Sequence, residues 1–161
     1  MGGGYSAYPD PKAYVSPQLL KKALVTAGFE VFRTTPEEVI VAERVRENLI
    51  LDSGVRLRGG APLKVRVVLR AQRVDFPSEE EAAIFERVRR LAEPAVAAGF
   101  AEVSEQVHRI MDPVDAQRTL DTFYEIVFSR DAEGLDSALE GIKFAMSLEK
   151  TVGGGPGGGG E

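Results

Sequence analysis

The chain has 161 residues, of which 43% are hydrophobic and 28% charged, and its formal net charge is −5. These values are typical of one folded globular domain and exclude a wholly disordered chain, while the negative charge argues against nucleic acid as the partner of the molecule as a whole. The lack of cysteine excludes disulfides and thiolate metal sites, and the single histidine, His108, excludes histidine-rich ones.

Both ends of the chain are predicted to be flexible. Residues 1–14 form an arm that has neither the basic start nor the apolar stretch of a secretory signal. Residues 151–161 are rich in glycine, which loses the most entropy on ordering, and so predict a disordered tail. No apolar run approaches the roughly 20 residues of a membrane span. We therefore expect a cytoplasmic protein without membrane contact, folded as one domain over 15–150.

The first helix is expected to begin after Ser16 and to end at Gly28. Ser16 supplies an N-cap, and Pro17 fits the first helical position, where its missing N–H costs nothing. Apolar residues then recur at helical spacing, and Gly28 predicts a left-handed C-cap. The same Ala-Gly-Phe triplet recurs at 98–100, where it predicts the end of the second helix.

Strands are expected between these two helices. In the segment 37–46, Val39-Ile40-Val41 favours a strand, whereas the preceding Thr-Pro-Glu-Glu could start a helix; the strand is the preferred interpretation. The segments 49–58 and 64–72 are joined by a Gly-Gly-Ala-Pro turn and predict a β-hairpin. In its second strand apolar and basic residues alternate, which is typical of a half-buried strand.

The C-terminal half predicts two more helices and two strands. Ser78 to Glu81 has the pattern of a capping box for the second helix, which Pro94 should kink or break. Residues 101–111 and 122–129 predict paired strands, with Phe123, Ile126 and Phe128 in the core and Tyr124 pointing toward the surface. The third helix is expected over 131–150, where an interior glycine at 141 indicates close packing.

The expected order of elements is therefore α-β-β-β-α-β-β-α. Because neighbouring strands are joined by short turns, this order predicts an α+β fold with a mainly antiparallel sheet and helices packed on one face. Over Ser16–Lys150 the order resembles the type III secretion chaperone-like fold. The resemblance implies a dimeric binder of other proteins rather than an enzyme.

Few residues could carry catalysis. The chain has neither of the familiar phosphate-binding glycine loops, and His108 is interpreted as a half-exposed strand residue. The acidic residues Asp112, Asp115 and Asp121 surround a proline turn, where aspartate bonds its own backbone amides. We therefore predict no enzyme, no cofactor and no metal. The alternative is a small-ligand sensor or enzyme that uses the region 112–124.

The distribution of charge is the one feature above background. Between Arg44 and Arg73, eight residues are basic and only two are acidic. The stretch 75–86 contains five acidic residues and no basic one. In a hairpin, basic residues of equal parity share a solvent face. This predicts a basic sheet face, which consists of Arg56, Arg58, Lys64, Arg66 and Arg70.

The basic sheet face has two interpretations. Charged side chains can keep exposed strands from pairing with other chains. Alternatively the face docks an acidic partner, which makes the protein a non-enzymatic protein-binding module or chaperone-like adaptor. The partner is another protein or a second copy in a homodimer, in which Glu79–Glu81 would be the complementary patch. The other alternative is a binder of nucleic acid or another polyanion through 44–73.

Overall fold

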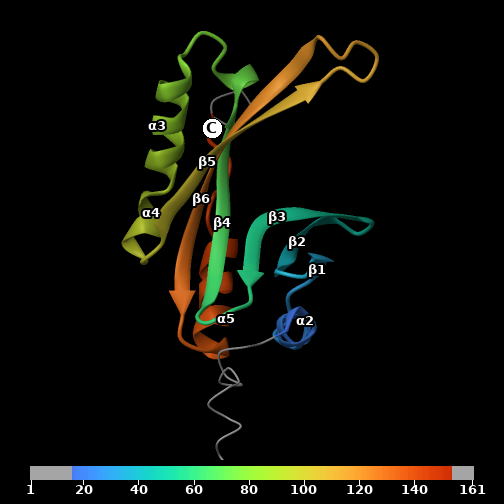
Figure 1. Ribbon diagram of the computed structural model, residues 1–161, viewed down its shortest axis with the longest axis vertical. Helices are drawn as coiled ribbons and strands as arrows, with labels where there is room; N and C mark the ends of the chain where they lie inside the picture. Colours follow the sequence, from blue (N-terminus) through green and yellow to red (C-terminus); the bar gives the residue numbers. More distant parts are fainter. Residues whose placement is uncertain (1–15, 154–161) are drawn as a thin grey trace, which may run out of the picture. The chain divides into compact units, whose positions relative to one another are not determined.

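The computed structural model of the protein describes residues 16–153. The predicted arm over 1–14 and the tail beyond 153 lie outside them. The helices are α2 (Pro17–Thr26), α3 (Glu81–Leu91), α4 (Glu93–Ala97) and α5 (Leu135–Met146). The strands are β1 (Val31–Thr34), β2 (Glu38–Arg46), β3 (Leu49–Arg58), β4 (Leu63–Gln72), β5 (Ala101–Met111) and β6 (Thr119–Ala132) (Figure 1).

The six strands form one antiparallel sheet in the order β1-β2-β3-β4-β6-β5. The predicted α+β class is therefore confirmed. The chain divides into two compact units. Unit 1 holds the described residues up to Val67 together with Ser129–Ser147, and unit 2 holds Val68–Phe128 and 148–153. The expectation of a single domain over 15–150 stays a prediction.

In unit 1, helix α2 begins and ends as the sequence predicts. The Ser16 hydroxyl accepts a hydrogen bond from the Leu19 N–H at 3.3 Å, with Pro17 in the first turn. At the other end Gly28 has a φ of +99°, a conformation that favours glycine because it has no Cβ. Leu20 and Leu24 on the inner side of the helix are fully buried. Local sequence thus determines this helix at both ends.

The segment 37–46 is a strand, β2, as preferred. The segment before it closes a turn, in which the Thr35 N–H donates to the carbonyl of Glu38 at 2.9 Å and the Thr35 hydroxyl accepts the N–H groups of Glu37 and Glu38. This turn connects β2 to β1, a four-residue strand that the sequence analysis did not predict. Its pairing is antiparallel, with Thr34 opposite Val39. A strand this short offers no alternation to detect.

Strands β3 and β4 form the predicted hairpin. Arg56 lies opposite Arg66, and Arg58 lies opposite Lys64. The odd-numbered residues Val55, Leu57, Val65 and Val67 are fully buried, which confirms the predicted alternation. Side chains at the even positions therefore point to the other face of the sheet.

Helix α5 packs against the buried face of this hairpin. A Cβ added at Gly141 would lie only 3.0 Å from Cγ2 of Val65 and 2.8 Å from the Arg130 guanidinium. The glycine therefore permits the close approach that its place inside a helix indicated. The helix begins at Leu135 rather than near residue 131, because β6 continues to Ala132.

In unit 2, the second predicted helix is divided as expected. Helix α3 ends at Leu91, and α4 starts at Glu93 with Pro94 in its first turn. The predicted capping box at Ser78 is wrong, since the N-cap residue is Glu80 and no side chain hydrogen-bonds to the start of the helix as a cap. Arg73 donates to the carbonyl of Glu79, and this contact holds residue 79 outside the helix. The start of the helix is thereby displaced by two residues.

Strands β5 and β6 form a long hairpin (Figure 1). Strand β5 follows α4 and leads to the turn of the hairpin, and β6 returns from that turn. The expected surface position of Tyr124 was wrong: the residue is 5% exposed and packs edge-on against Phe85 of α3, with ring centroids 5.5 Å apart. Tyr124 shares strand parity with Ile126 and Phe128, which are also buried. Phe123 therefore faces the other way and is only half-buried.

Unit 2 also contains the last described residues. The N–H of Arg70 donates to the carbonyl of Lys150, and the N–H of Val152 donates to the carbonyl of Arg70, both at 2.9 Å. Thr151 forms a parallel bridge with Arg70, and Val152 is buried. The ordered chain thus extends beyond Lys150, where we placed the start of the tail.

Candidate functional site

Four of the five predicted docking residues form a cluster in unit 1. Arg56 and Arg58 on β3 lie directly opposite Arg66 and Lys64 on β4. All four occupy even positions, so they lie on the face of the sheet that is turned away from α5. These residues are called the unit 1 cation cluster below.

Acidic side chains bind most of this cluster. Asp52 accepts two hydrogen bonds from the Arg56 guanidinium, both at 2.9 Å. Lys64 Nζ lies 2.7 Å from Asp131 Oδ1, and Glu38 lies 3.9 Å from the guanidinium groups of both arginines on β3. Because these contacts offset much of the local positive charge, the cluster is less basic than the sequence window predicted.

Arg66 is the exception within the cluster. Its Nε is buried and has no hydrogen-bond partner, and no acidic side chain among residues 16–153 pairs with it. The Ser129 hydroxyl of β6 is likewise buried without a partner. Since Lys64 reaches Asp131 across antiparallel strands, stepping two residues along each strand places Arg66 beside Ser129. Buried polar groups are normally satisfied, so this pair of orphaned atoms requires an explanation.

The fifth predicted residue, Arg70, belongs to unit 2. Its guanidinium lies 3.6 Å from Glu125 and 4.9 Å from the centre of the Phe123 ring. Glu125 also approaches His108, with 3.1 Å between Oε1 and Nε2. Arg70 therefore has its own partners in unit 2 and is not assigned to the unit 1 cation cluster.

In the region 112–124, which the alternative prediction names, the polar side chains hydrogen-bond to nearby groups. Asp112 and Asp115 accept backbone N–H groups of their own turn, at 2.8 and 3.0 Å. Asp121 accepts the Val74 N–H, and the Tyr124 hydroxyl accepts from Arg73 at 2.8 Å. Each polar group thus has a structural partner nearby. Within residues 16–153 no group of three His, Cys, Asp or Glu side chains could hold a metal ion.

The acidic stretch at the start of α3 is also bound by arginines. Arg87 donates to Glu79 at 2.9 and 2.5 Å, and this hydrogen bond lowers the pKa of the carboxyl. Further along α3, Arg89 binds both Glu102 and Glu105 of β5. The hydrogen bond between Arg89 and Glu102 lowers the pKa of the Glu102 carboxyl and raises the pKa of the Arg89 guanidinium. Within the acidic stretch, Glu79 is therefore bound by Arg87 and Glu86 by Arg89, so part of its negative charge is offset.

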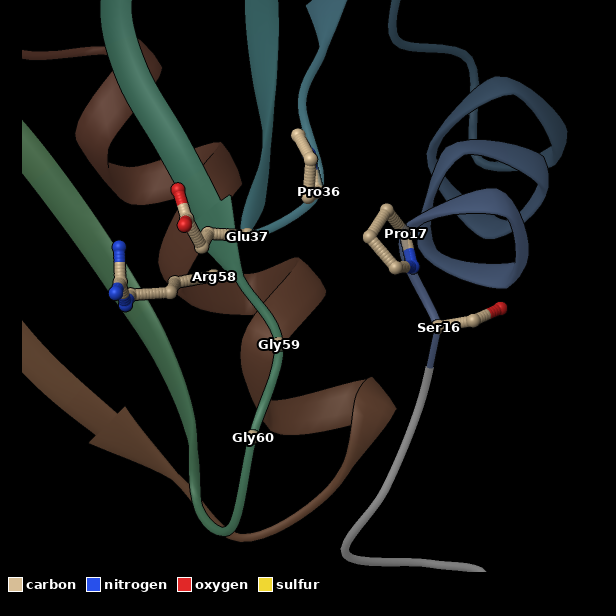
Figure 2. A pocket seen from close by; sticks show the side chains of 7 residues that line it. All are labelled: Ser16, Pro17, Pro36, Glu37, Arg58, Gly59 and Gly60. Atoms are coloured by element: carbon tan, nitrogen blue, oxygen red, sulfur yellow. The ribbon is translucent and has the colours of Figure 1, made fainter.

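Unit 1 also contains a pocket of about 230 Å³ beside the start of α2 (Figure 2). Figure 2 shows the side chains of Glu37 and Arg58 extending away from α2. On the side of the pocket that α2 forms, no two reactive side chains therefore meet. Its lining consists of Ser16, Pro17, Pro36, Glu37, Arg58, Gly59 and Gly60.

Comparison with known proteins adds no identification. No family model, no curated protein and no solved structure matches the chain. None of the helices in the described part of the chain is long and apolar enough to cross a membrane.

The sequence analysis missed the acidic partners of the cluster and the hydroxyl of Ser129. Glu38 lies opposite Arg58 in the β2–β3 register, so a correct prediction of that pairing would have found it. Asp131 is 67 residues from Lys64, and no local pattern connects the two. Ser129 carries no signal in the sequence beyond its place in a strand.

Proposed function

We propose that the protein is a non-enzymatic protein-binding module that receives an acidic segment of a partner on the unit 1 cation cluster. The observation that carries this proposal is the guanidinium of Arg66, which is half-buried and has no acidic partner among the described residues. A cation in such a place is unfavourable until an anion joins it. A carboxylate matches the planar guanidinium and forms charge-assisted hydrogen bonds with it.

The surroundings of Arg66 favour a carboxylate of a protein over a nucleic acid. Asp52, Glu38 and Asp131 already offset the neighbouring cations, so the cluster accommodates one additional negative charge better than a chain of phosphates. The fold resemblance implies a chaperone-like binder of other proteins, and we retain this form of the proposal together with the expected cytoplasmic location. Acidic partner segments would then be recognised one carboxylate at a time.

Fluorescence anisotropy with a labelled polyglutamate peptide tests the proposal. We expect the wild-type protein to bind the peptide and the Arg66→Gln variant to bind it about tenfold more weakly, because charge-assisted hydrogen bonds are lost. The matched control is Arg46→Gln, an exposed arginine at the end of β2 in the same unit, which should leave binding unchanged.

Two results would contradict the proposal. One is equal affinity of the wild type and Arg66→Gln for the peptide, or no binding by either. The other is tighter binding of a labelled oligothymidylate with a steep dependence on salt, which would favour the polyanion alternative.

A further inference from the structure

Strand β5 is an exposed edge strand. It stands at the end of the sheet, with β6 as its neighbour on one side. All eleven of its residues are exposed or half-exposed, and Val103, Ile110 and Met111 are 50%, 45% and 40% exposed. The free edge of such a strand presents unpaired backbone N–H and C=O groups, which can pair with another strand.

The side chains on one face of β5 form a self-complementary pattern. Because side chains alternate along a strand, the odd-numbered positions point to one face. From Val103 to Met111 their order is apolar, acidic, apolar, basic, apolar, which gives the same pairing scheme when a second copy is read in the opposite direction. The five residues are Val103, Glu105, Val107, Arg109 and Met111.

Antiparallel pairing of two β5 strands about Val107 matches every one of these positions. Val107 of each copy lies opposite Val107 of the other, and Glu105 of each copy lies opposite Arg109 of the other. Val103 then lies opposite Met111. Cross-strand pairs of apolar groups and of opposite charges each stabilise a sheet.

Neighbouring registers are less favourable. Pairing about Glu105 places two carboxylates opposite each other, and pairing about Arg109 places two guanidinium groups opposite each other. Pairing about Gln106 or His108 brings no acidic residue opposite a basic one on this face. Like charges directly opposite one another destabilise a sheet, so the pattern selects a single register.

The side chains that would form the ion pairs are suitably placed. Arg109 makes no ion pair with any residue in the range 16–153. Glu105 is held by Arg89 from α3, but a carboxylate has acceptor sites for a second guanidinium. Glu105 could therefore bind Arg109 of a second copy without releasing Arg89.

We propose that β5 is a self-association strand through which two copies of this chain pair, antiparallel and centred on Val107. The proposal goes beyond the partner site on the unit 1 cation cluster, because it uses other residues in the other unit. It also differs from the homodimer contact at Glu79–Glu81 that the sequence suggested. In that contact, Glu79 is already bound by Arg87 of the same chain.

Disulfide trapping tests the register directly, because the chain has no cysteine of its own. In a Val107→Cys variant the two new thiols lie directly opposite and should form a dimer under mild oxidation. In the Val103→Cys control the two thiols are about 26 Å apart along the paired strands, so this variant should stay uncrosslinked. No crosslink at position 107, or equal crosslinking at both positions, would overturn the proposal.

Sedimentation velocity tests the charge pairing. Arg109→Glu places two acidic residues opposite each other at two positions and should weaken the dimer at least about tenfold. Arg118→Glu makes the same charge change in the hairpin turn, outside the paired segment, and should have little effect. A wild-type protein that stays monomeric at high concentration, or an equal response of the two variants, would overturn the proposal.

Discussion

The two units differ in how they satisfy the half-buried arginines on β3, β4 and α3 and at Arg73. In unit 2, Arg87 and Arg89 of α3 each bind glutamates, and Arg73 binds two backbone carbonyls and the Tyr124 hydroxyl. In unit 1, Arg56 binds Asp52, but Arg66 directly opposite has no acidic partner among residues 16–153.

A charge count along the sequence therefore does not predict the charge of a surface. In the acidic stretch 75–86, Glu79 is bound by Arg87 and Glu86 by Arg89, both on α3. The basic stretch 44–73 is offset by Glu38 and Asp131, which lie outside it. Within the unit 1 cation cluster, Arg66 has no acidic partner among the described residues, and that residue is a sharper candidate for binding than the broad patch.

The largest effect on this comparison is expected from Asp52→Ala. The variant leaves Arg56 without its bidentate partner, with only Glu38 at 3.9 Å, and leaves the Gly54 N–H without its acceptor. We expect a loss of about 2–3 kcal/mol in the free energy of unfolding, measured by urea denaturation. Asp52→Asn retains an acceptor for Gly54 and should lose less; equal stability of all three proteins would contradict the expectation.

A similar experiment in unit 2 removes a partner of Arg73. Tyr124→Phe deletes the hydroxyl that accepts from Arg73 at 2.8 Å but keeps the ring against Phe85. We expect a loss of about 1–2 kcal/mol by urea denaturation, since a hydrogen bond to a charged donor is lost at a buried position. An unchanged midpoint would mean that water replaces the hydroxyl at no cost.

Arg66→Leu should increase the stability of the protein, whereas the two preceding variants should reduce it. Replacing a half-buried cation that has no acidic partner with an apolar side chain should stabilise the protein by about 1 kcal/mol while abolishing binding of the polyglutamate peptide. Arg56→Leu, at the position directly opposite, is the matched control and should destabilise because Asp52 loses the two hydrogen bonds that it accepts from the guanidinium. Thermal unfolding of the two variants measures the contrast, and a decrease in both melting temperatures would refute it.

The smallest effect concerns the pH dependence of unit 2. The hydrogen bond from Arg89 lowers the pKa of Glu102, so this pair stabilises the fold above the ordinary glutamate pKa and ceases to do so as pH falls through the lowered value. Because both side chains are partly exposed, Glu102→Gln should cost less than about 1 kcal/mol at neutral pH. Denaturation of both proteins at successively lower pH should show this difference shrink once the pH falls below the ordinary glutamate pKa; a constant difference would argue against the ion pair.

The sequence by itself determined the local features of the fold. The helix starts at Ser16-Pro17, the glycine caps at Gly28 and Gly99 (φ +99° and +98°) and the break at Pro94 are all present. The alternation of β4 also predicted its buried face. Each of these features depends on residues within a few positions of one another, where backbone sterics and side-chain caps act directly.

Only the tertiary structure decided which charges remain unpaired. The partners of Lys64 and Arg58 come from β6 and β2, and the burial of Tyr124 depends on Phe85 of α3. Pairing between strands brings together residues that are far apart in the chain, and a shift of one residue in register would move each side chain to the other face. The isolation of Arg66 beside Ser129 is therefore a property of the assembled sheet and not of any sequence window.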